Sequence, residues 1–164
     1  MLGTSACIVM REFAHSLVID APPAAVLDAF FDAEALEAWW EVSRAVCVPR
    51  PLGSYAVEWE TTEARDAVLG PLGGAFHGTV MEFRAGLEFF VADAYWLPPE
   101  GDPIGPMAFE AVCRPEGDRT LLIVRQSGYD ESSPRWARYY DIVSAGWIPT
   151  LNSLKKYLED RWAS

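Results

Sequence analysis

The side chains that could do chemistry in this chain of 164 residues are few and form no familiar catalytic motif. The two histidines, His15 and His77, lie far apart, and no Ser-His-Asp order, glycine-rich phosphate loop or zinc-ligand spacing occurs. The residue pattern alone therefore does not establish an enzyme, and ligand binding must be weighed beside catalysis.

Charge and cysteine content narrow the classes of partner. The formal net charge of −11 repels nucleic-acid phosphates and anionic membrane surfaces, so we expect no nucleic-acid partner. Cys7, Cys47 and Cys113 match neither a disulfide framework nor a zinc site, which favours a reducing cytoplasm, with no metal and no cofactor. Residues 1–9 have neither a basic segment nor a long apolar run. They predict an N-terminal extension rather than a signal peptide or membrane span.

Aromatic residues are the first indication of a binding function. They make up 13% of the chain, with seven tryptophans, and hydrophobic residues make up 51%. Such a chain has large apolar surfaces that must be covered by a core or offered to a ligand. Composition alone favours the core.

The strongest periodic signal is a C-terminal helix over residues 133–162. Ser133 is a suitable N-cap and Pro134 fits the first turn. Apolar residues recur every three or four positions and would form one stripe on the helix: Trp136, Tyr140, Val143, Trp147, Leu151, Leu154 and Leu158. A long amphipathic helix of this kind requires a sheet to pack on.

The preceding residues predict that sheet. Alternating apolar residues and turn signals indicate seven strands: 11–20, 44–48, 54–60, 74–83, 87–96, 107–114 and 119–126. Two short helices, 23–31 and 33–40, separate the first two strands. This order predicts an α+β fold in which a curved, seven-stranded antiparallel sheet wraps around the terminal helix.

Two long connections and one apolar outer face are further features. Residues 61–73, which could contain a helical turn, and residues 98–106 could gate a cavity at the rim of the sheet. Leu121 and Ile123 alternate with the inward residues of the last strand, so both of its faces are apolar. Either a central position in the sheet or a homodimer contact would explain this pattern.

Four segments resemble a known family in the same order as they occur here. They are IDAPPAAVLDAFFDAEALEAWW at 19–40, GTVMEF at 78–83, RTLLIVRQSGY at 119–129 and GWIPTLNSLKKYLE at 146–159. The chain resembles the START-like (SRPBCC) superfamily, with its birch-pollen-allergen-like helix-grip fold. Within it, the chain is most similar to the AHSA-type family, named after the C-terminal domain of activators of a heat-shock-chaperone ATPase. The resemblance implies one START-like domain over residues 1–164.

The resemblance also implies an apolar cavity between the sheet and the terminal helix, and it leaves three functions open. The first is binding of a hydrophobic or aromatic small molecule, such as a lipid or a polyketide. The second is a polyketide cyclase/dehydratase-like or hydrolase-like enzyme. In such relatives an Arg, Tyr or Asp aids proton transfer, a role that Tyr140 with Asp93 or Arg125 would take here if these side chains converge in the fold. The third is a co-chaperone-type protein-interaction domain. An apolar cavity with a few convergent polar groups is the usual seat of small-molecule binding, so we expect the first.

Inward-facing positions give the residues expected to line this cavity. The predicted ligand-binding residues are Trp39, Trp40, Tyr55, Val57, Trp59, Phe76, Val80, Phe89, Val91, Phe109, Tyr140, Ser144 and Trp147. His77, Asp93 and Tyr95 lie near strand ends, where they could orient a ligand through hydrogen bonds.

Overall fold

The computed structural model describes residues 10–130 and 132–162. Seven strands form one antiparallel sheet in the order β1-β9-β8-β7-β6-β3-β2. Their bounds are β1 Met10–Ile19, β2 Arg44–Cys47, β3 Ser54–Trp59, β6 Gly74–Arg84, β7 Glu88–Leu97, β8 Ile104–Glu116 and β9 Arg119–Asp130. The predicted α+β helix-grip fold is confirmed, whereas the predicted extension at 1–9 lies outside the described residues.

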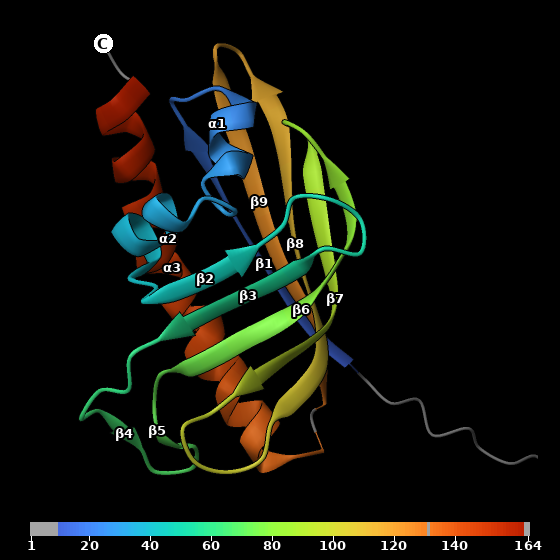
Figure 1. The fold of residues 1–164 in the computed structure, drawn as a ribbon, viewed down its shortest axis with the longest axis vertical. Helices are drawn as coiled ribbons and strands as arrows, with labels where there is room; N and C mark the ends of the chain where they lie inside the picture. The colour runs from blue at the N-terminus through green and yellow to red at the C-terminus, as the bar shows by residue number, and fades with distance from the viewer. Residues whose placement is uncertain (1–9, 131, 163–164) are drawn as a thin grey trace, which may run out of the picture.

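Three helices lie on one face of this sheet (Figure 1). They are α1 Pro23–Asp28, α2 Ala33–Trp40 and α3 Pro134–Trp162. The predicted N-cap Ser133 accepts a hydrogen bond from the Trp136 N–H, and Asp32 caps α2 by accepting one from the Ala35 N–H. Helix α3 contacts α2, β1 and β9, while α1 packs on β8 and β9. No helix within 10–130 and 132–162 is both long enough and apolar enough to cross a bilayer.

Several predicted boundaries differ from the structure, most of all at the ends of α1 and β9 and at the start of β8, which begins at Ile104 rather than at residue 107. Helix α1 ends at Asp28 rather than Phe31, and the chain then forms turns closed by the Phe30 and Phe31 N–H groups. Strand β9 continues beyond Gln126 to Asp130, because its partner β1 supplies a ladder as far as Met10. Pairing with a strand that is distant in sequence thus extends β9 beyond the point at which its local apolar alternation stops.

The connection at 61–73 contains a small hairpin rather than the expected helical turn. Strands β4 Arg65–Asp66 and β5 Gly70–Pro71 pair with each other. The Asp66 carboxylate accepts hydrogen bonds from the Val68 and Leu69 N–H groups and pairs with Arg138 of α3, with Arg138 Nη2 at 2.8 Å from Oδ1. These bonds fasten the loop to the helix. They also lower the pKa of Asp66 from 3.8 to about 2, mainly through the hydrogen bond from Arg138.

Candidate ligand cavity

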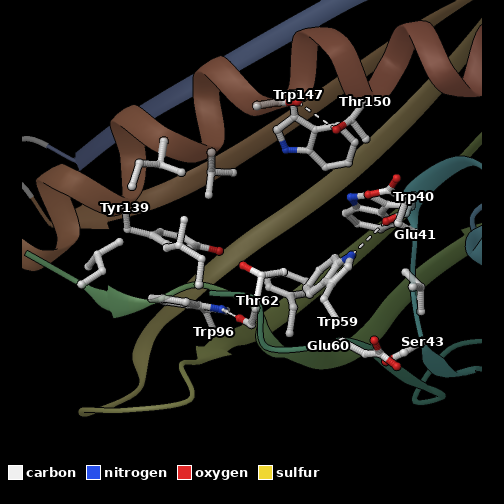
Figure 2. A pocket seen from close by; sticks show the side chains of 18 of the residues that line it. Trp40, Glu41, Ser43, Trp59, Glu60, Thr62, Trp96, Tyr139, Trp147 and Thr150 are labelled. Carbon is white, nitrogen blue, oxygen red and sulfur yellow. Dashed lines mark hydrogen bonds between the residues drawn. The ribbon is translucent and has the colours of Figure 1, made fainter. Parts of the chain in front are cut away.

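A cavity of about 740 Å³ opens between the lower half of α3, the end of α2 and the strand ends (Figure 2). Its walls come from α2 and the following turn, the end of β3, the 61–73 loop, β6, β7, β9 and α3. The lining residues are Glu37, Trp40, Glu41, Val42, Ser43, Trp59, Glu60, Thr62, Leu69, Leu72, Gly73, Phe76, Trp96, Gln126, Tyr139, Ile142, Val143, Gly146, Trp147 and Thr150. The space between sheet and helix is therefore not filled by side chains.

Aromatic rings make up most of the cavity wall and are held in fixed orientations. The Trp40 ring centroid lies 5.0 Å from that of Trp147 and 5.2 Å from that of Trp59. On the opposite side, Trp96 stacks on Tyr139 at 5.1 Å with an interplanar angle of 19°. Indole N–H groups anchor two of these rings, since Trp59 donates to the Trp40 carbonyl at 3.0 Å and Trp96 to the Gly73 carbonyl at 2.8 Å. Rings held in this way resist collapse into the open space.

The interior also contains polar groups. Gln126 and Tyr139 are 4% and 6% exposed, and Figure 2 shows the Tyr139 hydroxyl directed toward the open space. Burial raises the pKa of the Tyr139 phenol above its ordinary value of 10, so the group is neutral at physiological pH. A neutral phenol can both donate and accept a hydrogen bond. The cavity can thus orient a largely apolar molecule through a small number of polar contacts.

Four of the thirteen predicted ligand-binding residues lie on this wall: Trp40, Trp59, Phe76 and Trp147. Seven others pack in the core instead, and these are Trp39, Tyr55, Val57, Val80, Phe89, Val91 and Phe109. Phe109 lies directly behind the wall, with its ring centroid 5.7 Å from that of Trp147 and 6.0 Å from that of Phe76. Alternation identified the inward face of the sheet correctly, but it does not reveal which inward rings meet another ring and which meet empty space.

Tyr140 and Ser144 lie against β1 rather than on the cavity wall. The Tyr140 ring packs edge-on against Phe13 at 5.6 Å, and its hydroxyl donates to the Glu12 carbonyl at 3.3 Å. The Ser144 carbonyl accepts a hydrogen bond of 2.7 Å from His15 Nε2. Helix α3 packs on β1 with one side and faces the cavity with the other. The apolar stripe predicted from the sequence contains residues from both of these sides of α3.

Sequence reasoning missed Tyr139, Ile142, Gly146 and Thr150, which are the cavity residues of α3 beside Val143 and Trp147. They are spaced by three or four positions and form a second helical stripe, parallel to the one predicted. This spacing is typical of one face of a helix, but Gly146 and Thr150 carry too little apolar surface for the face to be recognised as an apolar stripe. Leu69 and Leu72 were missed because the hairpin that positions them has only two residues in each strand.

The side chains proposed for catalysis are not brought together at the cavity. Arg125 is exposed on the outer face of β9, 3.3 Å from the Glu110 carboxylate, whereas Tyr140 packs on β1. Asp93 is exposed, and neither it, His77 nor Tyr95 lines the cavity. Within 10–130 and 132–162, no group of three His, Cys, Asp or Glu side chains is arranged to hold a metal ion. The described side chains considered for catalysis therefore do not form one acid–base site at the cavity.

Comparison with solved structures gives the same fold. A crystal structure of a Mesorhizobium loti protein superposes with a TM-score of 0.68 at 18% identity, covering 92% of this chain and 98% of that one. A Chromobacterium violaceum protein gives 0.65 at 22% identity, with 90% and 96% covered. The solution structure of an Aha1 dimer from Colwellia psychrerythraea gives 0.63 at 15% identity, with 91% and 96% covered. Among curated proteins, no sequence relative is found.

A sequence model of a protein family matches this chain directly. The model described as "Activator of Hsp90 ATPase homolog 1-like protein" matches residues 20–159, which is most of the chain. This range contains all three helices except the last residues of α3, and all the residues that line the cavity. The AHSA-type resemblance seen in the sequence is thus confirmed, and the chain belongs to the family of proteins like activator of Hsp90 ATPase homolog 1.

Proposed function

We propose that this protein binds a hydrophobic or aromatic small molecule in the cavity between the sheet and α3. The observation that carries the proposal is an open volume of about 740 Å³ walled by Trp40, Trp59, Phe76, Trp96, Tyr139 and Trp147. Pockets for drug-sized ligands typically occupy roughly 300–1,000 Å³ and are lined mainly by apolar and aromatic side chains. A wall of this composition gains free energy when a ligand replaces the water in the open space.

Gly146 provides a direct test of the proposal. It lines the cavity from α3, and a Cβ atom built at this position meets no other atom within 4 Å. Since Gly146 is exposed at the edge of the cavity, Gly146→Leu would place a longer side chain at this edge without displacing the wall. Gly146→Ala is the matched control, because it makes the same change to the helix backbone but fills little of the cavity.

Binding can be followed with N-pentyl dansylamide, a neutral apolar probe whose emission responds to its surroundings and to energy transfer from tryptophan. We expect Gly146→Leu to weaken binding by about tenfold or more, whereas Gly146→Ala should bind like the wild type. Both variants should be more stable by about 1 kcal/mol or less, because glycine is a poor helix former. Unchanged affinity in a folded Gly146→Leu protein, or no binding by the wild type, would overturn the proposal.

Three related expectations remain proposals. Residues 1–164 form a single domain, the protein is cytoplasmic, and it pairs as a homodimer through the outer face of β9, where Leu121 and Ile123 are half-buried. The fold neighbour described as an Aha1 dimer supports the last of these. Sedimentation equilibrium of the wild type and of Ile123→Glu would test it, and a wild type that stays monomeric at high concentration would refute the dimer.

A further inference from the structure

The charges around the cavity are all of one sign. Its lining includes three carboxylates, Glu37, Glu41 and Glu60, and contains no lysine, arginine or histidine. All three are exposed, at the end of α2 and the end of β3, and Figure 2 shows Glu41 and Glu60 on the same side of the open space. A ligand that enters here therefore passes a negative potential that no lining cation offsets.

These carboxylates also lack counter-ions. Within the part of the chain that the structure describes, no basic nitrogen lies within 4.0 Å of Glu37, Glu41 or Glu60. Some other carboxylates of the protein are paired, as Glu58 is with Arg44 at 2.8 Å and Asp66 with Arg138 at 2.8 Å. Like charges around one opening cost electrostatic free energy, which a cationic ligand would relieve.

The aromatic residues of the cavity wall also favour a positively charged ligand. Four tryptophans and one tyrosine line the cavity, and the negative face of an indole ring is the best aromatic partner for a cation. The protein already uses this contact elsewhere, with the Arg11 guanidinium 5.0 Å from the Tyr140 ring centroid and that of Arg161 4.4 Å from the Tyr157 centroid. In the cavity, one face of Trp40 stacks on Trp39 and one face of Trp147 on Phe109, and both rings also border the open space.

One indole donor indicates a second property of the ligand. Trp147 is only 3% exposed, and its indole N–H has no acceptor among the described residues, although the nitrogen itself remains accessible to solvent. Figure 2 shows this nitrogen on the cavity side of the ring. Water in the cavity can satisfy this donor, and an acceptor on a ligand would replace that water. The carboxylates make an uncharged oxygen the better acceptor.

We propose that the cavity is selective for organic cations: an apolar or aromatic body that ends in an amine or quaternary ammonium group and carries an uncharged acceptor oxygen. The cation lies near Glu37, Glu41 and Glu60 and against the indole faces, and the acceptor oxygen reaches Trp147. This inference rests on the proposed function, because it specifies the ligand class of the same cavity. Fatty acids and other carboxylates are correspondingly disfavoured.

Three dansyl probes with one body and different ends separate charge from apolar binding. Dansylcadaverine ends in an ammonium group, N-pentyl dansylamide in a methyl group and dansyl-aminohexanoate in a carboxylate, and all three carry sulfonyl oxygens as acceptors. At low salt the cation should bind at least about tenfold more tightly than the anion, with the neutral probe between them. Since the carboxylates are exposed, the ratio should shrink at roughly 0.5 M salt.

Matched variants test whether the three carboxylates cause the selectivity. The triple variant Glu37→Gln, Glu41→Gln and Glu60→Gln should reduce the cation-to-anion ratio to below about threefold, because it weakens binding of the cation and relieves repulsion of the anion. The control variant Glu116→Gln, Asp118→Asn and Asp160→Asn makes the same change in net charge at exposed positions outside the cavity lining. It should keep the wild-type ratio. Trp147→Phe should weaken all three probes about fivefold, because it keeps a ring but removes the donor.

The outcomes separate the two proposals. If the neutral probe binds but the ammonium probe binds no tighter than the carboxylate probe, the cation proposal is overturned and the proposed function stands. The cation proposal also fails if the control variant lowers the ratio as much as the cavity variant does. If no probe binds the folded wild type, both proposals fail.

Discussion

Two groups of aromatic side chains lie between the sheet and the helices, one packed and one bordering open space. The packed cluster, formed by Phe30, Phe31, Tyr55, Phe89 and Phe109, closes on itself with ring centroids 5.0–6.2 Å apart. The cavity rings, formed by Trp40, Trp59, Trp96, Tyr139 and Trp147, border an open volume of about 740 Å³. The cavity rings are mostly tryptophan, yet Phe76 also lines the cavity and Trp39 is buried in the core, so residue type alone does not assign a ring to its group.

The segments that cover them do distinguish them. Phe89 is the second residue of β7 and Phe109 lies in the interior of β8, and rings from the turn after α1, Phe30 and Phe31, contact them. Trp40 and Trp59 are the last residues of α2 and β3, Trp96 is the next-to-last residue of β7, and Tyr139 and Trp147 lie within α3. Rings beneath the turn after α1 meet other rings, whereas rings beside the 61–73 loop and α3 border the open space between these segments.

The largest expected difference between the two groups is in stability. Phe109 is fully buried and touches rings from both groups, so Phe109→Ala should lower the free energy of unfolding by about 4 kcal/mol. Trp59 is half-buried on the cavity wall, and Trp59→Ala should cost about 2 kcal/mol. Chemical denaturation measures both effects. Equal losses, together with unchanged binding of N-pentyl dansylamide to Trp59→Ala, would remove the distinction between core and wall.

A smaller effect of opposite sign is expected inside the packed cluster. The Tyr55 hydroxyl is buried and has no hydrogen-bond partner among the described residues, and burial raises the pKa of this phenol well above 10. Tyr55→Phe should therefore stabilise the protein by about 1 kcal/mol, because it removes a buried polar atom that has lost its water.

Tyr139→Phe is the matched control, since Figure 2 shows that the Tyr139 hydroxyl faces the cavity. Thermal unfolding of both variants should show a gain only for Tyr55→Phe. A loss of stability in Tyr55→Phe would mean that its hydroxyl has a partner, such as a bound water molecule, inside the cluster.

The smallest expected effect is on the 61–73 loop, which lines the cavity. The folded-state pKa of Asp66, about 2, is lower than its ordinary value of 3.8. The ion pair with Arg138 thus contributes fully above about pH 4, and its contribution is lost as the pH falls through about 2. Amide chemical shifts of Val68 and Leu69, whose N–H groups donate to Asp66, should titrate in this window.

Asp66→Asn should reproduce the acid shifts at neutral pH and weaken binding of the dansyl probes. It should not change the exchange of amide protons in β7 and β8, which support the packed cluster. A titration midpoint of these amides near 3.8 would show that the Arg138 contact is absent in solution.

The comparison also explains what could be predicted from the sequence. Strand alternation and helix periodicity depend on neighbouring residues, so the order of elements and the inner face of the sheet were predictable. The cavity depends on distances between elements, which local patterns do not contain. Tyr139 and Tyr140 show this limit, because adjacent residues of one helix face the cavity and β1 respectively. The 61–73 hairpin is fastened by Arg138, which lies far away in sequence, so local sequence patterns do not predict the hairpin either.

Gly146 has a consequence for how relatives of this protein could diverge. Most positions in a folded protein are coupled to their neighbours, so a larger side chain requires compensating substitutions. At Gly146 the added side chain meets only empty space, and the helix tolerates most residues. A single nucleotide change at this codon could therefore change the size of the accepted molecule without loss of stability. Descendants of one ancestral gene could acquire different ligand ranges at this position before any other residue changes.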